Sequence, residues 1–197
     1  MMSRPIIALS GPRCCGKSTI AGHLVSQHGY TRIAFADALR EIAATANANL
    51  DGDRLYLARL GGKLRELVPD FFLQVVHNRL DSIEGPIVIE DVRFPSEYEF
   101  CRAIGAMTVR LEIPIETQLK RLASRDGKSG HEAEQLIECM DETALQSVTC
   151  WDYQVPAIGD FVELANTLHE MSLRFEYGSE SINPLVRTQD IRRGMGA

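Results

Sequence analysis

The sequence predicts an α/β fold in which a five-stranded parallel sheet carries helices on both faces. Short apolar runs typical of buried strands alternate with amphipathic stretches typical of helices, and this alternation favours a covered parallel sheet. A glycine-rich loop joins the first apolar run to the first helical stretch. A chain of 197 residues, 45% of them hydrophobic, can bury one such core with helical insertions but not two full domains.

The expected elements follow one another in the order that this fold requires. Apolar runs predict five strands, at Ile6–Leu9, Thr31–Ala36, Pro86–Ile89, Met107–Ile113 and Tyr153–Ile158. Apolar residues at helical spacing predict helices at Thr19–Val25, Ala38–Ala46, Leu55–Leu67, Phe71–Leu80, Glu97–Ala103, Thr117–Ala123 and Phe161–Leu173. One domain is therefore expected over residues 1–173, followed by a C-terminal extension at 174–197 that lacks periodicity.

Two insertions depart from a simple alternation of strand and helix. A helical stretch at about 37–84 separates the second and third strands and is far longer than one crossover needs. A second insertion, at about 115–135, contains the polar and basic segment 121–131, which is interpreted as a mobile loop. Both insertions are expected to project from the carboxyl ends of the strands, where ligands bind in open α/β sheets.

The loop between the first strand and the first helix is the most informative segment. Residues 11–18 read GPRCCGKS, a complete G-x-x-x-x-G-K-[ST] motif of the P-loop type. In such a loop, backbone N–H groups cradle phosphates, Lys17 reaches the β- and γ-phosphates and Ser18 binds Mg²⁺. The expected nucleotide-binding residues are Gly11, Cys14, Cys15, Gly16, Lys17, Ser18 and Thr19. For the two cysteines, plain packing is the alternative.

Two carboxylates follow the third predicted strand. A P-loop enzyme needs an acidic group at a strand tip beside the loop, to hold Mg²⁺ directly or through water. Asp91 is the expected group, because Arg93 places a cation two residues further on. The alternative is an acid that only caps a helix starting near Pro95.

Bulk composition argues against several classes of function. With 21 Lys and Arg against 27 Asp and Glu, the net charge of −6 disfavours a nucleic-acid polymer as partner. The five cysteines show no C-x-x-C spacing, which argues against a zinc site or a disulfide scaffold and suits a reducing cytoplasm. No apolar run has the length of a membrane span, so no membrane partner is expected, and the first strand begins too early for a signal peptide.

Motifs of other P-loop classes are missing. The sequence Asp91-Val92-Arg93-Phe94 lacks the glycine of a D-x-x-G switch, and no N-K-x-D motif for reading guanine occurs. An ABC-type signature is also missing, and the chain is too short for a hexameric motor domain. The expectation that remains is a P-loop NTPase of nucleoside monophosphate kinase type, in which one insertion holds the acceptor and the other is a lid.

Four further segments form a pattern with the P-loop. They read FADALRE at 35–41, LGGKLRE and then PDFF at 60–72, DVRFPSE at 91–97 and GHEAE at 130–134. They resemble the FADPLKE, LG-x-x-LRE…DPDFW, DVRFPNE and HESE motifs of deoxynucleoside monophosphate kinases from tailed bacteriophages. The resemblance spans about residues 6–171 and implies transfer of the ATP γ-phosphoryl group to a (deoxy)nucleoside 5′-monophosphate. The chain departs from that family at Cys14-Cys15 and at 158–164, where the family's asparagine is missing.

Phosphoryl transfer needs in-line positioning and neutralisation of several negative charges, and this assigns roles to basic residues. Arg13 and Arg93 are expected at the phosphates together with Lys17. Arg65 and Arg40, in the first insertion, are candidates for the acceptor phosphate, because a guanidinium group binds phosphate bidentately. The alternative for each is an arginine on a solvated helix surface.

The remaining candidates lie at the start of the first insertion and in the lid. Asp37 is expected to orient the sugar or the acceptor, or else to cap the following helix. Arg121 and Arg125 lie four residues apart, and so on one helical face, from which they are expected to swing toward the transferring phosphoryl group. A solvated basic face is the alternative. His131 and Glu132 are candidates to latch the lid or to contact base or sugar, with a structural hydrogen bond as the alternative.

Two other functions stay open. One is a P-loop kinase that acts on a modified base or hydroxyl in phage DNA, which the acidity of the chain disfavours. The other is a non-catalytic nucleotide-binding regulator, which has no need of lid arginines. The sequence gives neither the base nor the oligomeric state, for which a homodimer is one possibility. The expected location is the cytoplasm, that of the host if the chain is phage-encoded.

Overall fold

The computed structural model describes residues 4–47, 49–50, 53–127, 130–138 and 143–175. The chain divides into two compact units. Met1–Arg32 with Gly85–Ala197 is called the sheet unit, and Ile33–Glu84 the helical unit. Among the described residues, no helix is both long and apolar enough to cross a membrane.

The sheet has five strands in the order β2-β3-β1-β4-β5. They are β1 (Ile6–Ser10), β2 (Thr31–Ile33), β3 (Ile87–Val92), β4 (Met107–Glu112) and β5 (Tyr153–Pro156). β3, β1, β4 and β5 pair in parallel, and every residue of β1 is buried, as expected for a central strand covered on both faces. The predicted fold class is confirmed. The carboxyl ends of the strands form the edge at which ligands bind in folds of this kind.

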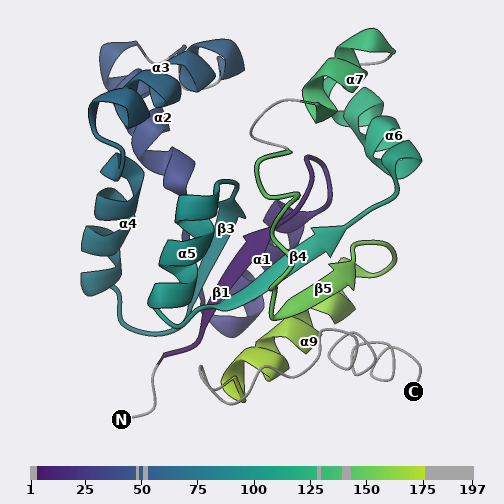
Figure 1. Cartoon of the computed structure of the whole chain (residues 1–197). Coiled ribbons are helices and arrows are strands. Elements are labelled where there is room, and N and C mark those ends of the chain that lie inside the picture. The colour runs from purple at the N-terminus through teal and green to yellow at the C-terminus, as the bar shows by residue number, and fades with distance from the viewer. Residues whose placement is uncertain (1–3, 48, 51–52, 128–129, 139–142, 176–197) are drawn as a thin grey trace. The chain divides into compact units, whose positions relative to one another are not determined.

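Helices cover the two faces of this sheet (Figure 1). α1 (Lys17–His28) follows β1 and α9 (Phe161–Leu173) follows β5, and their apolar residues pack with β1 and β4 in one core. α5 (Pro95–Ala103) connects β3 to β4 past β1. The connection through α1 runs from β1 to β2, and the connection through α5 runs along the sheet in the opposite direction. Because such crossovers are right-handed, the two helices lie on opposite faces of the sheet. α6 (Ile115–Asp126) and α7 (His131–Ile137) come between β4 and β5 in the chain.

The helical unit contains α2 (Phe35–Ala46), α3 (Arg54–Leu67) and α4 (Phe71–Asp81), and α2 contacts both other helices. Phe72, Val76 and Leu80 of α4 recur every four residues and are buried, so they form one apolar face. α3 approaches α2 closely at Gly61, where a Cβ atom would lie 3.3 Å from Cδ2 of Leu39. Glycine at this position therefore lets the two helices meet.

The second strand is shorter than the sequence predicts. β2 ends at Ile33, and α2 begins at Phe35. The reason is a capping interaction, in which the Asp37 carboxylate accepts a hydrogen bond from the backbone N–H of Ala34 (3.0 Å). An acid at the third position of a helix satisfies one of the N–H groups that its first turn leaves unpaired.

The second insertion contains more helix than predicted. α6 extends from Ile115 to Asp126, so the first part of the expected mobile loop 121–131 is helical, and α7 was not predicted. α7 is short and polar, and Ala133 is its buried residue, so it carries no apolar periodicity to detect. Residues 128–129 of this insertion and 176–197 of the expected extension lie outside the described residues.

Candidate active site

The P-loop joins β1 to α1, and its shape depends on two glycines. Gly11 has a φ of 142° and Gly16 a φ of 105°, values that residues with a side chain rarely adopt. A Cβ on Gly11 would lie 2.5 Å from the carbonyl oxygen of Leu111 in β4, and one on Gly16 would lie 2.5 Å from the ring of Phe161. Gly16 is the N-cap of α1, so the loop leads into a helix N-terminus, which carries partial positive charge.

The Lys17 ammonium group lies inside the loop. Its Nζ donates hydrogen bonds to the carbonyl oxygens of Gly11 (2.7 Å) and Pro12 (2.9 Å) and lies 3.5 Å from Cys15 Sγ. The residue is only 9% exposed. The loop thus encloses a positive charge, which fits the role that the motif predicts.

The other loop residues differ in exposure. Cys15 is fully buried in the core beneath the loop, which agrees with the packing alternative. Cys14 is half-buried and has a φ of 63°, the left-handed region. Arg13 is half-buried, whereas Ser18 and Thr19 are exposed in the first turn of α1.

Arg121 of α6 reaches the P-loop. Its Nη1 donates to the carbonyl oxygen of Cys14 (3.2 Å), and its Nη2 donates to that of Ala157 (3.3 Å), just after β5. Its guanidinium carbon lies 5.3 Å from the centre of the Phe161 ring, within the range of a cation–π interaction. Arg121, predicted as a lid residue, is therefore in contact with the loop itself.

The end of β3 is irregular at its two carboxylates. The register of β1 against β3 shifts between Ala8 and Ser10, where β3 carries one extra residue. Such a bulge changes the direction of side chains and is common beside active sites. The strand includes Glu90 and Asp91, whereas the sequence predicted an end before them. Glu90 forms a salt bridge with Arg32 of β2 (2.9 Å).

Glu97 fixes the turn between β3 and α5. Its carboxylate accepts hydrogen bonds from the backbone N–H groups of Arg93 (2.9 Å) and Phe94 (3.2 Å), and it is 2% exposed. Burial raises the pKa of the Cys101 thiol in α5 well above its ordinary value, and the negative charges of Glu97 and Asp91 add to this rise. Asp91 therefore lies near α5, and Arg93 directly follows the bulge.

In the helical unit, Arg65 is held against an aromatic ring. Its guanidinium carbon lies 4.4 Å from the centre of the Phe72 ring. A Cβ on Gly61, one turn earlier in α3, would lie 3.4 Å from Arg65 Nη1, so glycine leaves room for the guanidinium group. The LGGKLRE and PDFF segments are thus linked through one cation–π contact.

The Asp37 carboxylate has a structural role at the start of α2. One oxygen caps the helix at Ala34, and the other accepts a hydrogen bond from Arg40 Nη1 at 3.4 Å. The Arg40 side chain is 51% exposed. The capping alternative for Asp37 is therefore seen, and Arg40 is a surface arginine paired with it.

The remaining lid candidates are exposed. Arg125 lies one helical turn beyond Arg121 on α6, and His131 and Glu132 begin α7. The His131 ring nitrogen Nε2 lies 2.9 Å from Gln135 Nε2, and its Nδ1 lies 3.9 Å from the Glu134 carboxylate. These His131 contacts are local to α7, as the structural alternative predicted.

Two residues of the site were missed by sequence reasoning. Glu97 had a local signal, because Pro95 at the first helical position and Glu97 at the third are typical of a helix start. Phe161 had none, because its contacts with Gly16 and Arg121 connect segments far apart in the chain.

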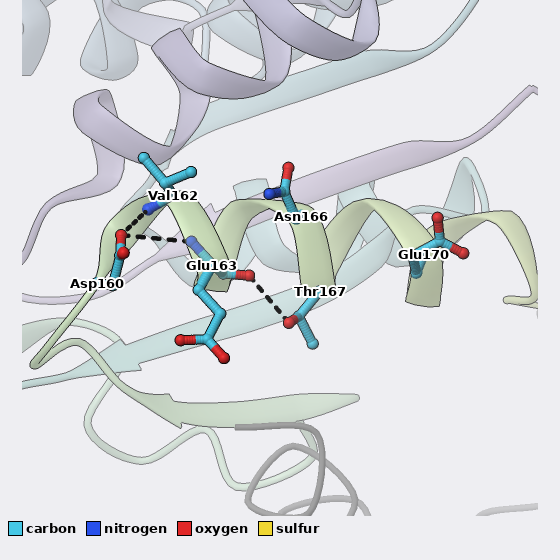
Figure 2. Close-up of a pocket in the computed structure, with 6 residues that line it drawn as sticks. All are labelled: Asp160, Val162, Glu163, Asn166, Thr167 and Glu170. Atoms are coloured by element: carbon cyan, nitrogen blue, oxygen red, sulfur yellow. Dashed lines mark hydrogen bonds between the residues drawn. The ribbon is translucent and has the colours of Figure 1, made fainter. Parts of the chain in front are cut away.

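A surface depression runs along α9 (Figure 2). It is lined by Asp160, Val162, Glu163, Asn166, Thr167 and Glu170. Asp160 caps α9 by accepting hydrogen bonds from the backbone N–H groups of Val162 (2.7 Å) and Glu163 (3.4 Å). This open surface of one helix carries none of the predicted site residues, and the candidate active site is the P-loop.

No family model matches the chain, and no curated protein matches it. Solved structures do match. TT1252 from Thermus thermophilus is 21% identical with a TM-score of 0.61, over 88% of this chain and 100% of that chain. Shikimate kinase from Bacteroides thetaiotaomicron is 20% identical with a TM-score of 0.60, over 86% and 98%. Shikimate kinase from Aquifex aeolicus is 18% identical with a TM-score of 0.56, over 86% and 96%. The chain therefore has the P-loop fold found in these shikimate kinases.

Proposed function

We propose that the protein is an ATP-dependent phosphotransferase that moves the γ-phosphoryl group to a (deoxy)nucleoside 5′-monophosphate and so forms the diphosphate. The observation that carries the proposal is the P-loop lysine, buried and bound by the loop's own carbonyl oxygens between β1 and α1. A cation fixed in this place neutralises charge on a bound polyphosphate at no further cost of reorganisation.

The residues of the sheet unit support binding of ATP with Mg²⁺. Ser18 offers an exposed hydroxyl in the first turn of α1, and Asp91 a carboxylate at the bulged end of the neighbouring strand. Hydroxyl and carboxylate oxygens are hard ligands that suit Mg²⁺. A bound Mg²⁺ would offset the negative charge of the phosphates. Of the two carboxylates, Glu90 forms a salt bridge with Arg32. Arg13 and Arg93 are proposed to contact phosphate oxygens.

The helical unit is proposed to hold the acceptor. Arg65 is the best candidate for its phosphate, because stacking on Phe72 orients a planar guanidinium that can bind two oxygens at once. Arg40 and Asp37 are proposed to assist at the sugar or phosphate in addition to their contact with each other. The nucleoside monophosphate as acceptor rests on the resemblance of residues 35–41, 60–72 and 91–97 to phage kinases.

Arg125 is proposed to approach the transferring phosphoryl group. It is exposed on α6, one turn from Arg121, which already contacts the P-loop. Charge on the phosphoryl oxygens is greatest during transfer, so a mobile arginine there acts mainly on turnover. His131 and Glu132 at the start of α7 are proposed to contact the base or sugar.

A second candidate acceptor is a small molecule with a hydroxyl group. Two of the structures with similar folds are shikimate kinases, so the fold itself suits a hydroxyl acceptor as well as a phosphate. The Arg65–Phe72 contact favours the phosphate.

The experiment is a turnover screen with ATP and Mg²⁺. The acceptors are the common ribo- and deoxynucleoside monophosphates, shikimate, gluconate and duplex DNA, and Lys17→Ala serves as the inactive control. We expect diphosphate formation from one or a few monophosphates. Transfer only to shikimate, gluconate or DNA would replace the proposed acceptor. Nucleotide binding with no transfer to any acceptor would indicate a regulator.

A further inference from the structure

Three segments of the sheet unit meet at one arginine. Arg121 of α6 donates to the carbonyl oxygens of Cys14 in the P-loop (3.2 Å) and Ala157 after β5 (3.3 Å). The same guanidinium group lies over the ring of Phe161 in α9, 5.3 Å from its centre. These contacts use a hydrogen bond from each terminal nitrogen and place the guanidinium carbon over an aromatic ring.

The P-loop end of this contact is a residue in an unfavourable conformation. Cys14 has a φ of 63°, and among the described residues no other non-glycine residue has a positive φ. A residue with a side chain stays in this region only where its surroundings hold it there. The hydrogen bond from Arg121 to the Cys14 carbonyl oxygen orients the peptide that follows Cys14.

The ring of Phe161 holds the other end of the loop. A Cβ on Gly16 would lie 2.5 Å and 2.8 Å from two atoms of this ring, so the ring packs directly on the glycine backbone. Phe161 is the first residue of α9, which Asp160 caps through two hydrogen bonds. The ring is therefore carried by a fixed helix end, with Gly16 and Arg121 both against it.

We propose that Arg121 and Phe161 are positioning residues that brace the P-loop in its phosphate-binding shape. They raise the affinity for the phosphates of the donor. They contribute neither to binding of the base nor to the rate of the transfer step. The inference rests on the proposed function in that the loop must bind a polyphosphate. It differs from a mobile Arg121, because a guanidinium group with two backbone acceptors and an aromatic partner has to give them up before it can move.

The test uses two ligands, ATP and inorganic tripolyphosphate, each measured with Mg²⁺ by calorimetry. The variants are Arg121→Ala, Arg121→Lys, Phe161→Leu and Phe161→Tyr. Lys120→Ala is the matched control, because it removes an exposed charge from the neighbouring position of the same helix. Arg121→Lys keeps the charge but cannot bridge two carbonyl oxygens from one planar group.

We expect Arg121→Ala, Arg121→Lys and Phe161→Leu to raise the Kd of both ligands by a similar factor, about tenfold. The two Arg121 variants lose charged hydrogen bonds, and Phe161→Leu loses the cation–π contact and the ring packed on Gly16. Phe161→Tyr keeps the ring and should stay within about threefold of wild type in each Kd, as Lys120→Ala should. In turnover assays, Arg121→Ala, Arg121→Lys and Phe161→Leu should have a higher KM for ATP than wild type and nearly the same kcat.

Three results would overturn the brace. Weaker ATP binding with unchanged tripolyphosphate binding would mean that Arg121 and Phe161 contact the base. A lower kcat with unchanged Kd values would make Arg121 a residue of the transfer step. A normal Kd in Arg121→Lys would reduce its role to charge alone. Failure of the proposed function is a separate result, namely tripolyphosphate binding by the wild type without transfer to any acceptor. A wild type that binds neither ligand would remove both.

Discussion

The donor loop of the sheet unit and the arginine-bearing helices of the helical unit are built by different means. The P-loop is shaped by backbone: two glycines at positive φ, a helix N-terminus, and carbonyl oxygens that hold Lys17. The helical unit offers side chains instead, with Arg65 on Phe72 and Arg40 on Asp37. The sequence pattern of a backbone site lies in a few neighbouring residues, even where distant side chains such as Arg121 and Phe161 contact it. A side-chain site depends instead on how helices pack.

This difference predicts how the two regions tolerate change. In the loop, a Cβ on Gly11 would meet the backbone oxygen of Leu111, which cannot move aside. In the helical unit, a Cβ on Gly61 would meet the ends of flexible side chains. We therefore expect substitutions in the loop to abolish function, and substitutions in the helical unit to change it only in degree.

The largest effect is expected from Lys17→Ala. This change removes the cation inside the loop and should lower kcat/KM about a thousandfold, since a fixed charge contributes this much to a transition state of growing charge. The melting temperature should stay close to that of Lys120→Ala, measured in parallel. A variant with turnover near wild type would show that the loop does not carry the chemistry.

Two smaller effects are expected, one on KM from the helical unit and one on kcat from the sheet unit. Arg65→Ala should raise the KM for the monophosphate about tenfold, because it removes the charged group that is proposed to donate hydrogen bonds to the monophosphate. Arg125→Ala should lower kcat about a hundredfold, because its charge is proposed to act on the transition state. Initial rates over a grid of both substrate concentrations give the two constants. The reverse pattern would mean that the roles are exchanged.

The two carboxylates at the bulge of β3 give the next test. Asp91→Asn should lower the apparent affinity for Mg²⁺ roughly tenfold, so that more Mg²⁺ is needed for the half-maximal rate. This is the usual cost of losing an oxygen that orients a metal or its water. Glu90→Gln should have little effect on the metal, because its partner is Arg32. Rates measured against Mg²⁺ concentration give both numbers. If only Glu90→Gln changes the metal dependence, Asp91 is the wrong carboxylate.

The smallest effect concerns the stability of the sheet unit toward acid. His169 of α9 stacks on His28 of α1 with ring centres 3.9 Å apart, and its Nδ1 lies 3.2 Å from the Tyr30 hydroxyl. Burial lowers the pKa of His169, as does charge on His28, and the charge of Glu170 acts in the opposite direction. The unfolded chain therefore takes up the proton first, so the free energy of unfolding should fall as the pH drops below about 6.5.

His169→Gln should flatten this part of the pH profile, and His131→Gln, on the exposed start of α7, should not. Urea unfolding at intervals between pH 7.5 and 5 measures the slopes. Equal slopes in the wild type and His169→Gln would show that this histidine does not cause the loss.

The same contrast explains how far the sequence predicts this molecule. The P-loop and the alternation of strands and helices could be predicted because both are local patterns. Hydrophobicity alone leaves the end of a strand undefined. The hydrogen bond from Ala34 to Asp37 moved the end of β2, and the register shift at Glu90 and Asp91 moved the end of β3. Phe161 could not be found, since its partners Gly16 and Arg121 meet it only through the fold.

The central claim is that the protein transfers phosphate to a bound acceptor and not to water. The most direct test compares two rates of the wild-type protein with saturating ATP and Mg²⁺. One is diphosphate formation with the best monophosphate from the screen, and the other is release of inorganic phosphate without acceptor. We expect transfer to exceed hydrolysis by about a hundredfold or more, because positioning of both groups is what lowers the barrier. Hydrolysis as fast as transfer, or no transfer to any monophosphate, would contradict the account.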